Sequence, residues 1–184
     1  MVKLPIVTRK KDVEIKSING QLVFDLREQI LTILGRDGDT VLLGDFFAEP
    51  AVNEVKGEVS WYSQASGSVR SFKDVDLNER LRIHEVLGQI DMKLKTSAEK
   101  VGKADSQLDW LGDAARAMLS VPDLDQSLFI VGDMPVLTQW GCIPFGSDPL
   151  LHQIVVSDPT RRKSLSDQAA SNALSPPLMP DPSD

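Results

Sequence analysis

The sequence predicts an α+β fold in which an antiparallel sheet of two or more hairpins packs against an antiparallel two-helix hairpin, followed by a disordered C-terminal tail. Residues 58–72 and 128–140 are rich in β-branched and aromatic residues around breaks that contain glycine. Residues 77–120 repeat apolar positions with the spacing of amphipathic helices. The tail, residues 157–184, is dominated by Ser, Asp, Pro and Ala, which bury too little apolar surface to fold.

The first expected elements are a short hairpin and a helix. Apolar and polar residues alternate over residues 13–18 ahead of Asn19-Gly20, a pair that adopts positive φ readily and favours a tight turn. Asp25 is expected to cap a helix that ends at Gly35.

A second short helix is expected over residues 40–47, capped by Asp39 and stopped by Pro50. It is not interpreted as a DNA-reading helix, because it offers Leu, Phe and Asp where base contacts need basic and amide side chains. Asp37, Asp39 and Asp45 do not have the ligand spacing of a calcium loop either.

Period-two patterning begins at Glu58 and predicts a hairpin through Phe72, with its turn at Ser66-Gly67-Ser68. Trp61 and Tyr62 are neighbours in the first strand, so their side chains point to opposite faces. One of them is expected in the core and the other partly exposed.

Two helices form the expected helical hairpin. The first covers residues 77–101, with Asp76 or Asp74 as its cap and Gly102 as its break, and the second covers residues 104–120 and ends before Pro122. Their apolar positions form a seam: Ile83, Leu87, Ile90, Leu94, Ser97 and Val101 on the first, and Ala104, Leu108, Leu111, Ala115 and Met118 on the second. Packing within the chain is favoured for this seam, and oligomerisation as a coiled coil or partner binding is the alternative.

The last expected hairpin places two apolar strands around Gly132-Asp133 and ends at Trp140-Gly141, with Pro135 at an edge or strand start. The apolar residues in 150–156 could dock as a final strand or helical turn. The sequence thus predicts a single interaction domain over residues 1–156.

Composition excludes several protein classes. The chain of 184 residues has a net charge of −7, which disfavours broad nucleic-acid binding. Two short basic runs, Arg9-Lys10-Lys11 and Arg161-Arg162-Lys163, are interpreted as solvated charge. Cys142 is the only cysteine, so a disulfide scaffold is excluded. Neither the apolar segment of a signal peptide nor one of about 20 apolar residues is found, so we expect a soluble cytoplasmic protein without direct membrane insertion.

The catalytic candidates lack partners in the sequence. His84 falls beside the helical seam, and His152 lies next to the tail. Cys142 follows Trp140-Gly141 and is expected to be partly exposed at a strand end, where no Lys, Arg or His is close enough in sequence to activate it. Isolated histidines do not form a zinc site, and no glycine-rich phosphate loop is present. We therefore expect no catalytic, cofactor-binding or metal-binding residues, and single out Trp61, Tyr62 and Trp140 as partner-binding or core aromatics.

Four segments together resemble the N-terminal region of bacterial SrfA-type virulence-associated proteins: residues 44–50, 57–62, 67–72 and 128–141. The similarity extends over about residues 20–145 and includes the order of the elements. Ser60 and Cys142 depart from the pattern, where Asp and an aromatic residue are typical of the family.

This resemblance implies a non-catalytic adaptor or scaffold subunit of a virulence-associated multi-protein assembly. Its implied protein partners are an actin- or Hsp70-like ATPase-fold protein and a coiled-coil or GTPase-like protein encoded nearby. A toxin or effector with another activity is the alternative function, and an enzyme fragment without its catalytic portion is a third.

Overall fold

The computed structural model describes residues 1–35 and 40–154, and the arrangement of its strands and helices confirms the predicted α+β class. Strands of one antiparallel sheet lie in the order β1 (Val2–Arg9), β6 (Glu58–Ser63) and β5 (Glu49–Asn53). A second antiparallel sheet contains β7 (Val69–Ser71), β8 (Leu128–Val131) and β9 (Met134–Leu137). Two strand pairs join β10 (Cys142–Pro144) to β2 (Val13–Ile15), and β3 (Ser17–Ile18) to β4 (Gln21–Leu22).

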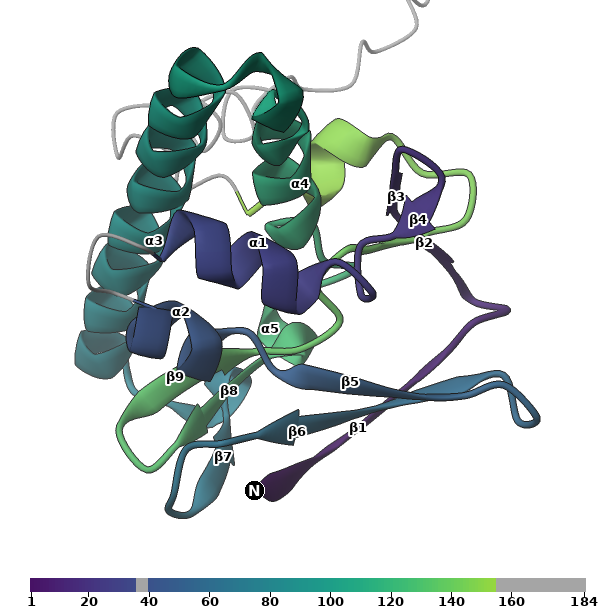
Figure 1. The fold of residues 1–184 in the computed structure, drawn as a ribbon. Coiled ribbons are helices and arrows are strands. Elements are labelled where there is room, and N and C mark those ends of the chain that lie inside the picture. Colours follow the sequence, from purple (N-terminus) through teal and green to yellow (C-terminus); the bar gives the residue numbers. More distant parts are fainter. Residues whose placement is uncertain (36–39, 155–184) are drawn as a thin grey trace, which may run out of the picture. The chain divides into compact units, whose positions relative to one another are not determined.

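The helices are α1 (Arg27–Leu34), α2 (Thr40–Phe46), α3 (Leu77–Ala104), α4 (Trp110–Met118) and the short α5 (Leu124–Ser127). The described part of the chain also forms 3₁₀ turns at η1 (Phe72–Asp74), η2 (Ser106–Leu108) and η3 (Pro149–His152). Helices α1, α3 and α4 pack against one another, and the β1-β6-β5 sheet lies below them in Figure 1. Within residues 1–35 and 40–154, no helix combines the length and apolar character that crossing a bilayer requires.

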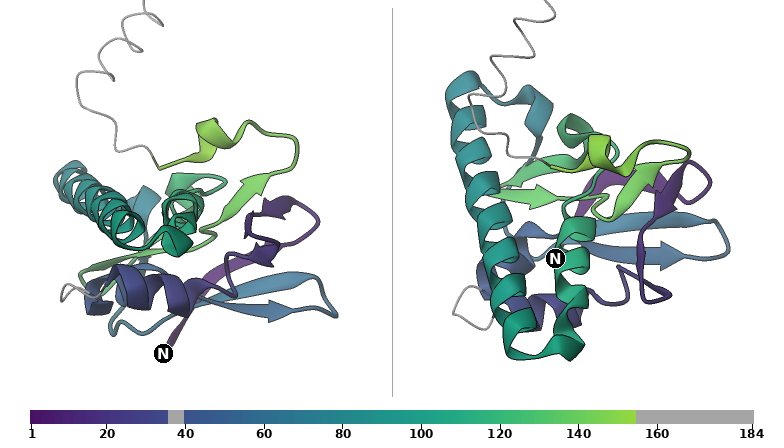
Figure 2. Two further views of the ribbon diagram at one scale, coloured as in Figure 1. Left: turned by 45° about the horizontal axis from the view of Figure 1, so that its top comes forward. Right: turned by 90° about the horizontal axis from the view of Figure 1, so that it is seen from above.

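Helix α3 begins where the sequence predicts, because the Asp76 side chain accepts a hydrogen bond from the backbone N–H of Glu79 at 2.9 Å. Gly102, however, does not break the helix, which continues to Ala104. A Cβ atom on Gly102 would lie 3.0 Å from the Asp109 carboxylate. This glycine therefore allows the close approach of α3 to the residue that precedes α4, and the antiparallel helical hairpin is confirmed (Figure 2).

The predicted seam of α3 is buried within the chain against α1 and α4. Its first four members are buried as expected, but Ala98 is buried in place of Ser97, and Val101 is half-buried. The second helix is shorter than predicted, since the chain forms η2 before α4 starts. The buried seam residues of α4 are Leu111, Ala115 and Met118, whereas Ala104 belongs to α3 and is exposed.

The hairpin predicted between Trp61 and Phe72 is wrong in its pairing. Strand β6 pairs with β1 and β5, and β7 pairs with β8 in the other sheet. The intervening Gly67 has φ +131°, and a Cβ atom there would lie 2.6 Å from Cα of Gly132. Two glycine turns thus pack backbone to backbone, which directs the chain from the first sheet to the second instead of folding it back.

Two local predictions in the N-terminal half are also wrong. Asp25 does not cap α1: the N-cap residue is Leu26, which makes no side-chain capping bond. Pro50 does not stop α2, because that helix already ends at Phe46 and Pro50 lies within β5. Strand β5 is an edge strand, where a residue without a backbone N–H is tolerated.

Several turns and strands match the predictions. Asn19 and Gly20 have φ of 51° and 79° and connect β3 to β4. Strands β8 and β9 form the expected hairpin around Gly132. Residues 149–154 dock on the segment after α4: the backbone N–H of Val121 donates to the carbonyl of His152 at 2.9 Å, and that of Ile154 donates to the carbonyl of Leu119 at 2.7 Å. The roles expected for Asp37 and Asp39, and the disordered tail over 157–184, lie outside the described residues.

Candidate functional site

Trp61 and Trp140 both lie in the core, with no exposed side-chain surface. Their ring centroids are 5.9 Å apart, and Phe24 makes edge contacts with both at 5.4 and 5.0 Å. Such T-shaped arrangements are favoured between aromatic rings. Of the two roles expected for these tryptophans, their placement fits the core role.

Each buried indole N–H has a hydrogen-bond acceptor. Trp61 Nε1 donates to Oγ1 of Thr8 at 2.9 Å, and Trp140 Nε1 donates to the carbonyl of Ala48 at 2.8 Å. The first bond joins β6 to β1, and the second joins the segment after β9 to the connection between α2 and β5. The two side chains therefore connect segments that are distant in the sequence.

Tyr62 points away from this core, as strand alternation predicts, and is half-buried. The register of the sheet places it in a row with Glu49 on β5 and Lys3 on β1. The next row on the same side contains Ala51, Ser60 and Val7, of which Val7 is 45% exposed. We call the surface formed by these six residues the outer sheet face.

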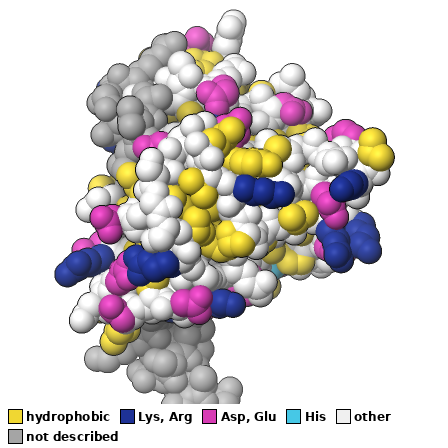
Figure 3. Space-filling view, turned by 90° about the horizontal axis from the view of Figure 1, so that it is seen from below, with side chains coloured by type: hydrophobic (Ala, Val, Ile, Leu, Met, Phe, Trp, Pro, Cys, Tyr) yellow, Lys and Arg dark blue, Asp and Glu magenta, His cyan; other side chains and the backbone are white. Residues whose placement is uncertain are grey.

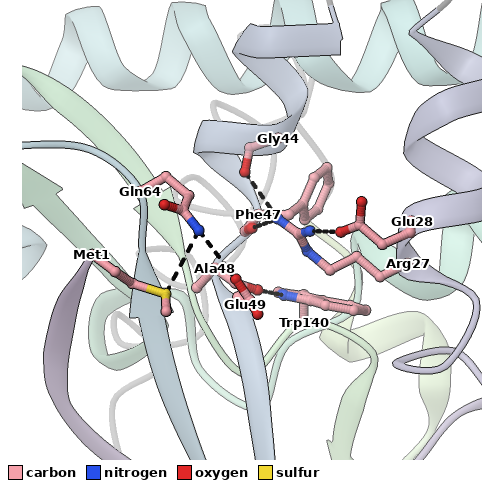
Figure 4. A network of polar contacts seen from close by, with 9 residues as sticks. All are labelled: Met1, Arg27, Glu28, Gly44, Phe47, Ala48, Glu49, Gln64 and Trp140. Carbon is pink, nitrogen blue, oxygen red and sulfur yellow. Dashed lines mark hydrogen bonds and ion pairs between the residues drawn. The ribbon is translucent and has the colours of Figure 1, made fainter.

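Charged side chains border the apolar part of the outer sheet face. Gln64 donates a hydrogen bond from Nε2 to the Glu49 carboxylate at 3.2 Å (Figure 4). Glu49 is the β5 neighbour of Tyr62 in the strand pairing. Figure 3 views the molecule from below, where hydrophobic side chains form a band among Lys, Arg, Asp and Glu. An apolar centre with a charged border is the composition of a protein interface.

Arg27 forms a buried polar contact that the sequence does not reveal. Its Nη2 donates to the carbonyls of Gly44 at 3.0 Å and Phe47 at 2.7 Å, and its Nη1 donates to the Glu28 carboxylate (Figure 4). The two carbonyls lie at the C-terminal end of α2, where backbone oxygens lack partners within a helix. Arg27 thus fixes the end of α2 against α1, and it acts as a structural residue.

The two histidines lie on different elements. His84 on α3 is half-buried, and its ring packs edge-on against Phe72 with 5.7 Å between centroids. His152 in η3 donates from Nδ1 to the carbonyl of Pro122 at 3.0 Å. In the part of the chain that the structure describes, no cluster of three or more His, Cys, Asp or Glu side chains is placed to hold a metal ion.

Cys142 is fully buried in β10, which corrects the expectation of a partly exposed thiol at a strand end. Pairing with β2 places β10 in the interior, and no local sequence pattern indicates that long-range contact. Burial raises the pKa of the Cys142 thiol from 9.0 to about 12. The reactive thiolate is therefore disfavoured in the folded protein at neutral pH.

We expect Cys142 to reduce stability in alkali. The unfolded thiol loses its proton near pH 9, whereas the folded thiol keeps it until about pH 12. Unfolding releases a proton in this range, so the free energy of unfolding falls by about 1.4 kcal/mol per pH unit from this group. Urea unfolding of the parent and of Cys142→Ala at about pH 8 and about pH 10.5 measures it. Equal losses in both proteins would contradict the assignment to Cys142.

Searches against protein-family models, curated proteins and solved structures returned no match to this chain. Sequence patterning identified Tyr62 but not Val7 or Ala51, because β1 and β5 were not predicted. The period-two alternation of Val2, Leu4, Ile6 and Thr8 with the residues between them is the sequence signal that could have indicated strand β1.

Proposed function

We propose that this protein is a non-catalytic adaptor or scaffold subunit that binds a protein partner through the outer sheet face. The observation that carries the proposal is the position of Tyr62 at the centre of an exposed sheet surface, between acidic Glu49 and basic Lys3. Central aromatic residues surrounded by polar ones commonly dominate the binding energy of protein interfaces.

The neighbouring row makes this surface suitable for close contact. Ala51 and Ser60 are small, so a partner side chain can lie beside the Tyr62 ring without a steric clash. Val7 adds exposed apolar surface across the strand from Ser60. A partner segment with an apolar side chain flanked by an acid and a base would complement Lys3 and Glu49, which favours one orientation of binding.

The other candidate surfaces support the proposal less well. The helical seam is occupied by α1 and α4, and the two tryptophans are in the core. The proposal that the protein is not a catalyst is supported by the burial of the Cys142 thiol and by its raised pKa. Following the resemblance to SrfA-type proteins, the proposed partners are an ATPase-fold protein and a coiled-coil or GTPase-like protein encoded nearby.

We expect Tyr62→Ala to weaken binding of such a partner about 30-fold, which corresponds to about 2 kcal/mol at an interface centre. The chain is purified with each neighbouring gene product, and affinity is measured by calorimetry. Leu81→Ala is the matched control, because Leu81 is also exposed but lies on α3. Both variants are first checked for parental thermal unfolding.

Two results would count against this function. A folded Tyr62→Ala variant with parental affinity would remove the outer sheet face from the interface. If the parent binds neither gene product at micromolar concentrations, the proposed membership of an SrfA-like assembly is wrong.

A further inference from the structure

A hollow of about 620 Å³ lies at the end of the β1-β6-β5 sheet, outside the outer sheet face. It is lined by Arg9, Lys10, Lys11, Lys56, Gly57 and Glu58. Four cationic side chains and one carboxylate therefore surround one small space, in a protein whose net charge is −7. Figure 3 shows Lys and Arg side chains gathered at the right-hand edge of the molecule, where the hairpin of β5 and β6 ends.

The fold creates this cluster by joining two turns. Lys10 follows β1, and its backbone N–H donates to the carbonyl of Gly57 at 2.8 Å. Gly57 has φ +64°, and the backbone N–H of Lys56 donates to Oδ1 of Asn53 at 3.0 Å, so the β5-β6 turn has a defined conformation. The sequence shows only the run of residues 9–11, which by itself is typical of solvated charge. The turn adds Lys56 to it.

Among the residues that the structure describes, Lys10 is the one member of the four cations with an ion-pair partner. Lys10 Nζ lies 2.7 Å from both carboxylate oxygens of Glu54. Arg9, Lys11 and Lys56 form no ion pair with any residue that the structure describes. Neither turn needs a cation for its backbone conformation, and Glu58, which lies opposite Arg9 in the pairing of β6 with β1, is the one carboxylate in the lining. The lining therefore carries an excess of positive charge, which favours binding of an anion.

We propose that this hollow binds a phosphoryl group, with Arg9, Lys11 and Lys56 as its direct ligands. A phosphate dianion offers three acceptor oxygens for several charge-assisted hydrogen bonds, whereas the single carboxylate of Glu54 engages Lys10 alone. The group belongs to a free phosphate compound or to a phosphorylated side chain. This inference does not depend on the proposed partner-binding face.

A compact anion fits the surface better than an extended one. Asp12, Glu54 and Glu58 lie in or next to the same two turns, so a nucleic acid or an anionic membrane would meet these carboxylates as well as the cations. Dissolved salt limits the interaction between exposed charges to a range of about 8–10 Å. A small ligand inside the hollow therefore interacts mainly with the cations that line it. Val55 at the hairpin tip is 98% exposed and is the feature that a membrane would use.

The test is a titration of the isotope-labelled full chain, followed by amide chemical shifts at constant ionic strength. We expect saturable shifts at Lys10, Lys11, Lys56 and Gly57 with inorganic phosphate and pyrophosphate, and none with chloride. A phosphoserine peptide and its unphosphorylated form are titrated in parallel, and tighter binding than phosphate identifies the peptide source. Lys11→Glu and Lys56→Glu should each raise the Kd about tenfold or more.

Lys73→Glu is the control, because it makes the same change of charge on the exposed η1 turn outside the hollow. Parental Kd values in the Lys11 and Lys56 variants, or shifts that chloride reproduces, would overturn the proposal. A third result would also overturn it. If the chain binds only vesicles of about 70% phosphatidylcholine and about 30% phosphatidylserine, and Val55→Asp abolishes that binding, the surface is a membrane contact.

Discussion

Replacing Trp140 with Ala is expected to lower the free energy of unfolding by about 3–5 kcal/mol. The side chain is completely buried and contacts Phe24, Phe47 and Trp61 with centroid separations of 5.0, 6.0 and 5.9 Å. Truncation removes these contacts, leaves a cavity and deprives the carbonyl of Ala48 of its indole donor. Urea unfolding followed by far-UV circular dichroism measures the loss.

Two further variants separate the causes. Trp140→Phe keeps a large ring but removes the N–H, so its smaller loss of about 1–3 kcal/mol reports the unpaired carbonyl of Ala48. Phe145→Ala is the surface control, because Phe145 is 60% exposed, and it should unfold like the parent. A loss below about 1 kcal/mol in Trp140→Ala would show that this ring is not part of a packed core.

The features that the sequence predicted correctly are those with a local physical cause. Asp76 caps α3 because its carboxylate reaches a backbone N–H three residues ahead, and Asn19-Gly20 forms a turn because both residues tolerate positive φ. The opposite orientations of Trp61 and Tyr62 follow from strand alternation alone. Such signals require no knowledge of distant residues.

The features that were missed depend on contacts between distant segments. Pairing of β6 with β1 is decided by which surfaces become buried together, and Thr8 accepts the Trp61 N–H across 53 residues. The capping of α2 by Arg27 and the addition of Lys56 to the basic run at residues 9–11 arise in the same way. Neither the outer sheet face nor the anion-binding hollow could therefore be located before the sheet order was known.

A second large effect is expected at the centre of the helical seam, where Leu87→Asp should abolish cooperative folding. The Leu87 side chain on α3 is 1% exposed, and Ile83 and Ile90 in the adjacent turns of the same helix are buried as well. Helices α1 and α4 both pack against α3, so an aspartate there would place an unpaired carboxylate in an apolar interface. The cost of several kcal/mol is comparable to the whole stability of a domain of this size.

Leu81→Asp provides a matched control, since the same substitution on the same helix falls at a position that is 55% exposed. It carries an equal penalty in helix propensity, and an acid near the N-terminus of α3 is if anything favourable. We expect Leu81→Asp to retain the parental circular dichroism spectrum and a cooperative thermal transition, and Leu87→Asp and Ile90→Asp to lose both. If the two seam variants melt like the parent, the seam is accessible to water and the packing of α3 against α1 and α4 is wrong. Positions 81 and 87 lie on the same helix and differ mainly in burial, so the comparison isolates most of the contribution of the helical seam to the fold.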